Sequence, residues 1–329
     1  MSSITESAKA LMPKLSEIRR DFHMHPEVSQ HEERTGKKVA EYLKEMGCDE
    51  VYENVGGYGV VGVIKGKKPG KVVALRADMD ALQIQEMNEV PYKSQNDGVM
   101  HACGHDNHMT GLLGAAMLLC ERRDEIAGTV KLIFQPAEEM SPVGGSRGML
   151  HYGYMDDVEA VFGLHVWPDL PHGKIGVKAG PLMAATDHFT INIHGKTAHG
   201  AKPNQGIDAV VLGSQFVMAA QTIVSRKVDP LDNAVVTFGI FNAGTRYNII
   251  AGDCTLDGTV RTLNEDTRAM IEDSMRKTLD GLCLQSGATA EINYGHGYPA
   301  LVNHEEDAEL IRNTAIELFG KDDVVDVKL

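Results

Sequence analysis

The stretch HMTGLLGAAMLLCE, residues 108–121, decides the fold class together with the apolar runs that follow it. It is apolar nearly all round, which is typical of a buried helix. Residues 128–134 and 158–164 are compact apolar runs, typical of strands that are covered on both faces. Two further helices are expected before this stretch, at residues 4–22 and 33–46. Strands that alternate with helices predict an α/β layer fold.

A second pattern begins near residue 187. It predicts a strand (188–194), a helix (206–226), two strands (234–241 and 253–261), a helix (266–284) and a strand (289–294). The order β-α-β-β-α-β is a compact split βαβ unit. Within the second of these helices, four apolar residues form one stripe at helical spacing: Ile271, Met275, Leu279 and Leu282. We therefore expect a small domain, residues 181–294, inserted into a larger α/β domain of residues 1–180 and 295–329.

Size and charge limit the function classes. A chain of 329 residues exceeds one typical core, so two domains are expected. Its formal net charge of -14 argues against nucleic acid and against an anionic membrane surface as partners. Five irregularly spaced cysteines suggest no disulfide framework, and neither a signal peptide nor a run of about 20 apolar residues is present. A cytoplasmic location is expected.

Metal-competent side chains gather in the segment HACGHDNH, residues 101–108. Cys103 and His105, with a glycine between them, can point at one centre, and a thiolate with an imidazole suits zinc. The alternative is a buried free cysteine beside surface histidines. The pair His23 and His25 also looks chelating, but it joins two helices, and a structural role is favoured.

Further candidates follow other predicted strands. Glu138 and Glu139 come after the strand that ends at residue 134, so one can bind metal while the other works on water. His165 also lies just past an apolar strand, where ligands of α/β sheets bind. Asp78 and Asp80 end another strand and are expected to orient a ligand histidine. Taken singly, a glutamate pair on a solvated loop and a structural histidine remain the alternatives.

Together these residues resemble the family of N-acyl-amino-acid amidohydrolases, hippurate hydrolases and auxin-conjugate (IAA-amino acid) hydrolases, relatives of the two-metal aminoacylases and carboxypeptidases. The resemblance runs in order through seven segments: FHMHPEVSQHEERT (22–35), LRADMDAL (75–82), HACGHDNH (101–108), FQPAEE (134–139), GLHVWP (163–168), GKTAHGAKPNQGIDAV (195–210) and YNIIAGDCTLDGTVRT (247–262). It implies a mixed-sheet metallopeptidase-type catalytic domain with an inserted ferredoxin-like lid. The lid also serves as the dimerisation surface, so a homodimer is expected.

The resemblance also implies roles for the candidates of the larger domain. Cys103 would bridge two divalent metal ions, Zn²⁺ or Mn²⁺. His105 and Glu139 would complete one metal site, and His165 would join the other. Glu138 would be the general base. The implied reaction is hydrolysis of the amide bond of a small N-acyl amino acid.

The lid residues follow from the same resemblance. His199 matches a residue that polarises the substrate carbonyl, often across a dimer. Asn248 and Arg261 match positions that hold the substrate carboxylate, and a guanidinium suits that task because it pairs with a carboxylate through two parallel hydrogen bonds.

Two departures from the family pattern stand out. Gln83 stands where the family usually has a proline. The family also has a last histidine ligand for the second metal, and this sequence shows no good counterpart up to Leu329. His304 is a poor substitute because it opens a predicted helix. We therefore expect a C-terminally truncated chain that holds one metal tightly rather than two. The alternative functions are a dipeptidase or carboxypeptidase with the same machinery, and a non-catalytic metal-binding or ligand-binding relative.

Overall fold

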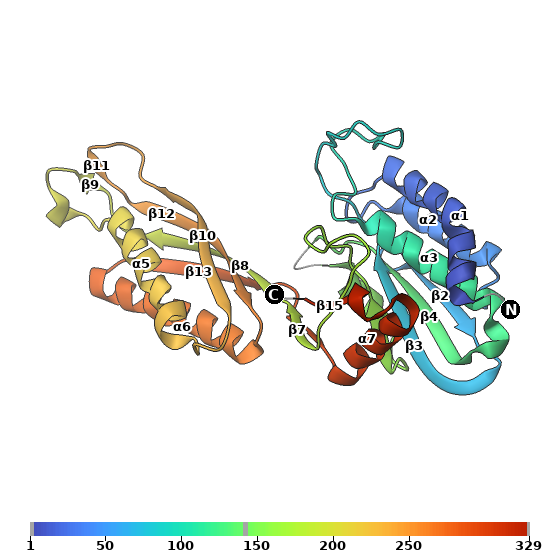
Figure 1. Cartoon of the computed structure of the whole chain (residues 1–329). Coiled ribbons are helices and arrows are strands. Elements are labelled where there is room, and N and C mark those ends of the chain that lie inside the picture. Colours follow the sequence, from blue (N-terminus) through green and yellow to red (C-terminus); the bar gives the residue numbers. More distant parts are fainter. Residues whose placement is uncertain (1–2, 141–143, 328–329) are drawn as a thin grey trace. The chain divides into compact units, whose positions relative to one another are not determined.

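A computed structural model describes residues 3–140 and 144–327 (Figure 1). The chain divides into two compact units, residues 1–174 and 175–329. The first unit carries the segments rich in histidine and carboxylates, and the second carries the β-α-β-β-α-β pattern. Among the helices of the described part, none has the length and apolar character to cross a bilayer.

The first unit is built on a five-stranded sheet with the strand order β1-β2-β4-β3-β5. Its strands are β1 (Glu50–Val55), β2 (Gly59–Lys65), β3 (Lys68–Asp78), β4 (Ala127–Gln135) and β5 (Ala160–Gly163). β3 runs parallel to β4 and β5, whereas β2 is antiparallel to β1 and β4. The expected mixed α/β class is confirmed. Because β3, β4 and β5 run in one direction, their carboxyl ends lie at one edge of the sheet.

Helices cover this sheet on the face that holds its main core. The helices of the unit are α1 (Ile4–Met24), α2 (Glu33–Glu45), α3 (His105–Glu121), η1 (Arg123–Glu125) and α4 (Gly145–Leu150). Leu132 and Phe134 of β4 pack with α1, α2 and α3, while Ile133 between them packs with Met149 of α4 on the other side. This alternation explains why the β4 run is apolar throughout.

The buried helix α3 begins earlier than its apolar stretch predicts. Its first turn contains His105, Asp106 and His108, all at most 2% exposed. These polar side chains are buried because they have partners from other elements, which the apolar pattern could not reveal. The motif histidines therefore sit on the first turn of a rigid helix.

The second unit contains a four-stranded antiparallel sheet with the order β10-β12-β8-β13. Its elements follow as β8 (Ala185–His194), α5 (Ala209–Lys227), β10 (Ala234–Ala243), β12 (Asp253–Thr262), α6 (Glu265–Ser286) and β13 (Thr289–His296). The predicted β-α-β-β-α-β order is confirmed. Both helices pack into a single core with the sheet (Figure 1). The stripe expected on α6 contributes to this core: Ile271, Met275, Leu279 and Leu282.

Short elements complete the second unit. They are β6 (Ile175–Val177), β7 (Gly180–Met183), β9 (Ala198–His199), η2 (Pro203–Gln205), β11 (Ile249–Ile250), β14 (Leu301–Asn303), α7 (Glu305–Phe319), η3 (Lys321–Asp323) and β15 (Val324–Asp326). β9 pairs with β11, β14 with β7, and β15 with β6. The return of residues 295–329 to the larger domain stays a prediction.

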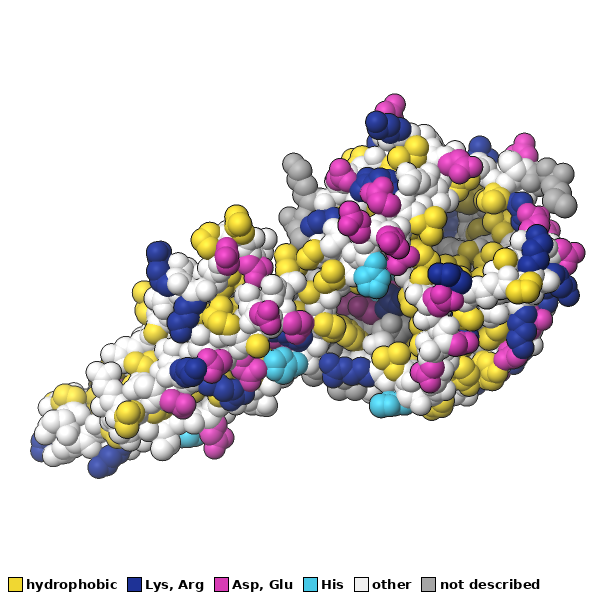
Figure 2. All heavy atoms as spheres, turned by 90° about the horizontal axis from the view of Figure 1, so that it is seen from below, with side chains coloured by type: hydrophobic (Ala, Val, Ile, Leu, Met, Phe, Trp, Pro, Cys, Tyr) yellow, Lys and Arg dark blue, Asp and Glu magenta, His cyan; other side chains and the backbone are white. Residues whose placement is uncertain are grey.

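The surface carries charges of both signs. On the face that Figure 2 shows, Lys and Arg lie among Asp and Glu rather than in one basic patch. The formal net charge is -14.

Candidate metal centre

Three parallel strands of the first unit end beside the candidate ligands. β3 ends at Asp78, β4 ends at Gln135 and β5 ends at Gly163. The loops that follow β4 and β5 carry the two glutamates and a histidine. Three overlapping groups have all their ligand atoms within 4.8 Å of one another: Cys103 with His105 and His165, His105 with Glu138 and Glu139, and Asp78 with His105 and His108. The shared sheet edge thus brings together residues that are far apart in the sequence.

The spacing of the ligand atoms matches that around a metal ion. Cys103 Sγ lies 3.4 Å from His165 Nε2, and His105 Nε2 lies 3.8 Å from Glu139 Oε1. Two nitrogen ligands about 2.1 Å from a tetrahedral zinc ion would lie about 3.4 Å apart. These spacings fit two overlapping ligand groups that share His105, Cys103 with His165 on one side and Glu138 with Glu139 on the other.

Hydrogen bonds on the outer ring nitrogens fix how the two histidines face this cluster. His105 Nδ1 donates to the backbone carbonyl of Asp80 over 2.8 Å, and His165 Nδ1 donates to the carbonyl of Val166 over 2.6 Å. Each Nε2 is left with a lone pair. In the described residues, His105 Nε2 is buried without a hydrogen-bond partner. An orphaned imidazole nitrogen beside a thiol and a carboxylate fits a divalent cation.

The pKa values of two residues in the cluster are raised. Burial lowers the pKa of His105, but its hydrogen bond to Asp80 and its contacts with Cys103 and Asp78 outweigh burial and raise the pKa to about 11. The pKa of Glu138 is also raised, chiefly by burial. For His105, the raised pKa reflects neighbouring acidic groups, whose charge a bound cation would also offset.

Asp78 and His108 support the cluster from behind. His108 Nδ1 donates to Asp78 Oδ1 over 2.6 Å, and His108 Nε2 accepts the Val166 N–H over 2.9 Å. Both ring nitrogens of His108 are engaged, so it orders the loop of His165 rather than offering a free ligand atom. Burial raises the pKa of Asp78, but the His108 hydrogen bond and the Arg76 guanidinium hold it well below its usual range.

Asp80 supports both a ligand and the turn after β4. Its backbone carbonyl holds His105, and its Oδ2 accepts from Ser29 Oγ over 2.6 Å and from the Glu139 N–H over 3.0 Å. Ser29 is a supporting residue that no local pattern in the sequence indicates, apart from its place in segment 22–35, one of the seven segments that carry the resemblance.

His23 belongs to a buried ionic network. Its Nδ1 lies 2.8 Å from Asp106 Oδ2 and its Nε2 lies 3.2 Å from Glu86 Oε1. Arg19 Nε also lies 2.7 Å from Asp106 Oδ2. His25 Nδ1 bonds to the backbone carbonyl of Asp21. These contacts tie α1 to the start of α3, as the structural interpretation of the pair predicts.

In the second unit, His199 and Asn248 lie together. β9 and β11 pair His199 with Ile249, and the Gly200 N–H donates to the Asn248 carbonyl. His199 is exposed, and its Nδ1 accepts the Ala201 N–H over 3.1 Å, which leaves the proton on Nε2. Asn248 Oδ1 is buried and, within the described residues, has no hydrogen-bond partner.

Arg261 lies on the four-stranded sheet, toward the end of β12 that is far from the β9–β11 pair. It is the ninth residue of β12, which begins at Asp253 next to the β9–β11 pair. Eight residue steps along a strand span about 26 Å. The guanidinium donates to Thr259 and to the Val260 carbonyl, and in the described part of the chain it forms no ion pair. The nearby strand residue Asp257 accepts from His188 and Thr190.

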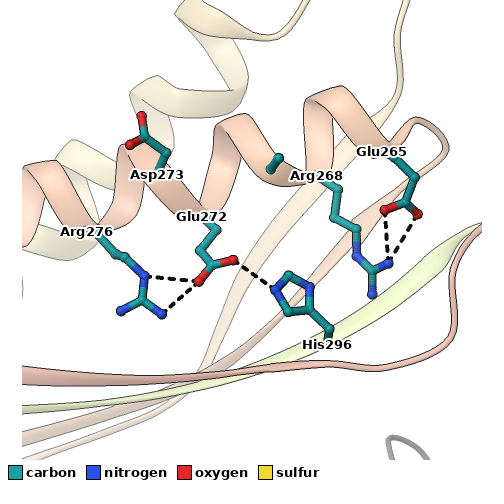
Figure 3. A pocket seen from close by; sticks show the side chains of 7 residues that line it. Glu265, Arg268, Glu272, Asp273, Arg276 and His296 are labelled. Carbon is teal, nitrogen blue, oxygen red and sulfur yellow. Dashed lines mark hydrogen bonds and ion pairs between the residues drawn. The ribbon is translucent and has the colours of Figure 1, made fainter.

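A hollow of about 340 Å³ on the second unit is a weaker candidate (Figure 3). Glu272 pairs there with Arg276 and with His296, and Glu265 pairs with Arg268 (Figure 3). Because these charges already compensate one another, the hollow offers no unsatisfied group to a ligand.

Residues 74–328 match the family described as peptidase family M20/M25/M40. The N-acyl-L-amino acid amidohydrolase of Geobacillus stearothermophilus is 45% identical over 288 residues, 88% of this chain and 77% of that protein. Thermostable carboxypeptidase 2 of Saccharolobus solfataricus is 42% identical over 308 residues, 93% of this chain and 78% of that protein.

A solved structure is similar over the same range. A dinuclear metal-binding peptidase of the M20 family from Bacillus subtilis has 38% sequence identity and a TM-score of 0.84, covering 97% of this chain and 83% of that one. The resemblance seen in the sequence motifs is thereby confirmed. The chain belongs to the peptidase family M20/M25/M40 and is a hydrolase of that family.

Proposed function

We propose that this chain hydrolyses the amide bond of N-acyl amino acids with a divalent metal, Zn²⁺ or Mn²⁺, held chiefly by Cys103, His105 and Glu139, while His165 belongs with Cys103 to a second metal site. The observation that carries the proposal is a pair of overlapping groups, Cys103 with His165 and Glu138 with Glu139, each within 4.8 Å of a His105 ligand atom, together with the unpartnered Nε2 of His105. A bound divalent cation supplies polarisation of the amide carbonyl and lowers the pKa of water from 15.7 to about 7.

Glu138 is the proposed general base. It lies in the same cluster as His105 and Glu139, and it is partly buried. A raised pKa helps a carboxylate to accept a proton from water and then to return it to the leaving nitrogen, since transfer is most efficient near the working pH. The partly buried base beside the ligands argues against a non-catalytic relative.

The second unit is proposed to hold the substrate. The Nε2–H of His199 can donate to the developing oxyanion, and Asn248 and Arg261 can bind the carboxylate. However, β12 separates Arg261 from the His199 end by about 26 Å, more than the length of a small N-acyl amino acid. One lid cannot present both ends to one substrate. We therefore propose that two copies share each site, with His199 and Asn248 from one and Arg261 from the other.

The exposed edge of the second unit supports such a homodimer. β10 is an edge strand whose Val235, Ile240 and Phe241 are 51%, 48% and 44% exposed. On α5, Met218 is 70% exposed. An edge strand with apolar side chains is a ready surface for pairing with a second copy.

A dipeptidase or carboxypeptidase is the second candidate function. The 42% identity to a carboxypeptidase favours it, because the same ligands serve both reactions. Only the acyl pocket separates the two substrate classes.

A substrate panel tests the proposal. N-acetyl and N-benzoyl amino acids and matched dipeptides are incubated with the protein after loading with Zn²⁺ or Mn²⁺. Faster turnover of the N-acyl compounds supports the amidohydrolase, and faster turnover of dipeptides supports the alternative. Metal analysis of Cys103→Ser, with Cys120→Ser as the matched control, should show loss only in the former. Equal metal content in both variants would refute the ligand set.

A further inference from the structure

The loop between α1 and α2 reaches the turn that carries Glu138. Glu32, the residue before α2, is 0% exposed, and its Oε1 accepts the Ala137 N–H over 2.6 Å. These two residues are 105 positions apart in the sequence. The side chain makes no hydrogen bond to its own helix. Its buried carboxyl is directed to the catalytic turn rather than to the helix it precedes.

Ala137 has an unusual backbone conformation. Its φ is +48°, in the left-handed region that non-glycine residues rarely adopt. Such a conformation persists only when surrounding contacts hold it. Two contacts do so here: Glu32 accepts from the Ala137 N–H, and the Ala137 carbonyl accepts from the Gly145 N–H over 3.1 Å.

The residue that follows is therefore held from both sides. On one side of Glu138, the Ala137 N–H is bound by Glu32. On the other side, the Glu139 N–H is bound by Asp80 Oδ2 over 3.0 Å. Two carboxyl groups from separate segments thus clamp the backbone around the proposed base. The direction of the Glu138 side chain depends on both.

We propose that Glu32 is a positioning residue for the hydrolytic reaction, which it supports by holding the Ala137 turn so that Glu138 points into the metal cluster. This inference rests on the proposed function. Glu32 touches neither substrate nor ligand, so its loss should lower kcat and leave KM nearly unchanged. A displacement of about 1 Å in a catalytic group can cost about 100-fold in rate.

Glu27 provides a matched control. Its carboxylate lies in the same loop and accepts two backbone N–H groups at the start of α2, from Arg34 over 3.1 Å and from Thr35 over 2.8 Å. The Glu27 side chain therefore supports the helix and not the turn. Glu27→Leu and Glu32→Leu remove the same charge from the same loop, so a general effect on folding would appear in both.

The test combines kinetics with hydrogen exchange. In Glu32→Leu we expect kcat to fall about 10- to 100-fold with KM within about 2-fold. Exchange of the amides of residues 137–139 should accelerate in the same variant. Glu32→Gln, which retains an acceptor oxygen, should recover most of the rate and the protection. Glu27→Leu should change neither, even if its melting temperature falls.

The outcomes separate this inference from the proposed function. If the unmodified protein hydrolyses no N-acyl compound, the proposed function fails, and the exchange measurement still decides whether Glu32 holds the turn. If the protein is active but Glu32→Leu matches Glu27→Leu in both rate and exchange, the positioning role is refuted. If Glu32→Leu does not fold, Glu32→Gln provides the test. Slow amide exchange of the Ala137 turn in Glu32→Gln would support the positioning role, and fast exchange there would refute it.

Discussion

Arg261→Ala should lower kcat/KM for substrates with a free carboxylate and leave it nearly unchanged for substrates whose carboxylate is amidated. A hydrogen bond between charged groups contributes about 1.5–3 kcal/mol. Arg261 is half-buried, so solvent screening favours the lower part of that range, about 1.5–2 kcal/mol. At 1.36 kcal/mol per tenfold, the expected loss in kcat/KM is about 10- to 30-fold on the free carboxylate. The amidated substrate should lose little, because it offers the guanidinium no charge.

The assay compares kcat/KM for an N-acetyl amino acid and its amide in both proteins. The free energy of unfolding should change by less than about 0.5 kcal/mol, because Arg261→Ala removes no ion pair among the described residues. Arg276→Ala is a suitable control, because Arg276 pairs with Glu272 and the variant removes the same charge from the same unit. Equal losses on the free and amidated substrates would rule out the carboxylate clamp.

Three further predictions concern other parts of the chain. Glu138→Gln should keep its metal content while hydrolysis falls about 100-fold or more, and unchanged turnover at equal metal loading would exclude Glu138 as the base. Contacts with Asp106 raise the pKa of His23 above its ordinary 6.5, so its stabilisation is fully present below pH 6.5 and is lost as pH rises through the folded-state pKa. Urea unfolding should therefore show a larger penalty for His23→Gln at pH 6 than at pH 9, and a pH-independent penalty would contradict this. Asp187 is 3% exposed and accepts hydrogen bonds from Arg268. Asp187→Asn should therefore lower the free energy of unfolding in urea by about 3–5 kcal/mol, whereas Asp253→Asn, at an exposed site, should change it very little. A similar loss in both variants would refute the argument.

The parts of the fold that depend on hydrophobic periodicity could be predicted from the sequence. The order of strands and helices in the second unit followed from the pattern of apolar residues, because the strands and both helices bury their apolar side chains in one shared core. The meeting of Asp78, Glu138 and His165 at one edge followed from their positions after apolar strands. Parallel strands place their carboxyl ends together whatever the loops between them do.

Long-range polar contacts could not be predicted in this way. Nothing local to Glu32 indicates that its carboxyl binds an amide 105 residues away, nor that Ala137 takes a positive φ. The sequence also could not predict that His199 and Arg261 lie far apart. Their motifs look equivalent as sequence, and only the run of β12 away from the β9–β11 pair separates the two residues.

The distance along the chain between Glu32 and Ala137 has a consequence for biosynthesis. A ribosome adds about 5–20 residues per second, so about 5–20 s separate the synthesis of these two residues. During this interval the carboxyl of Glu32 has no amide to bind, and His165 has not yet been translated. The nascent chain therefore cannot assemble the complete ligand set while the first helices form. Under the proposed function, a metal ion can therefore meet its complete ligand set only after β5 and the loop that carries His165 have been made.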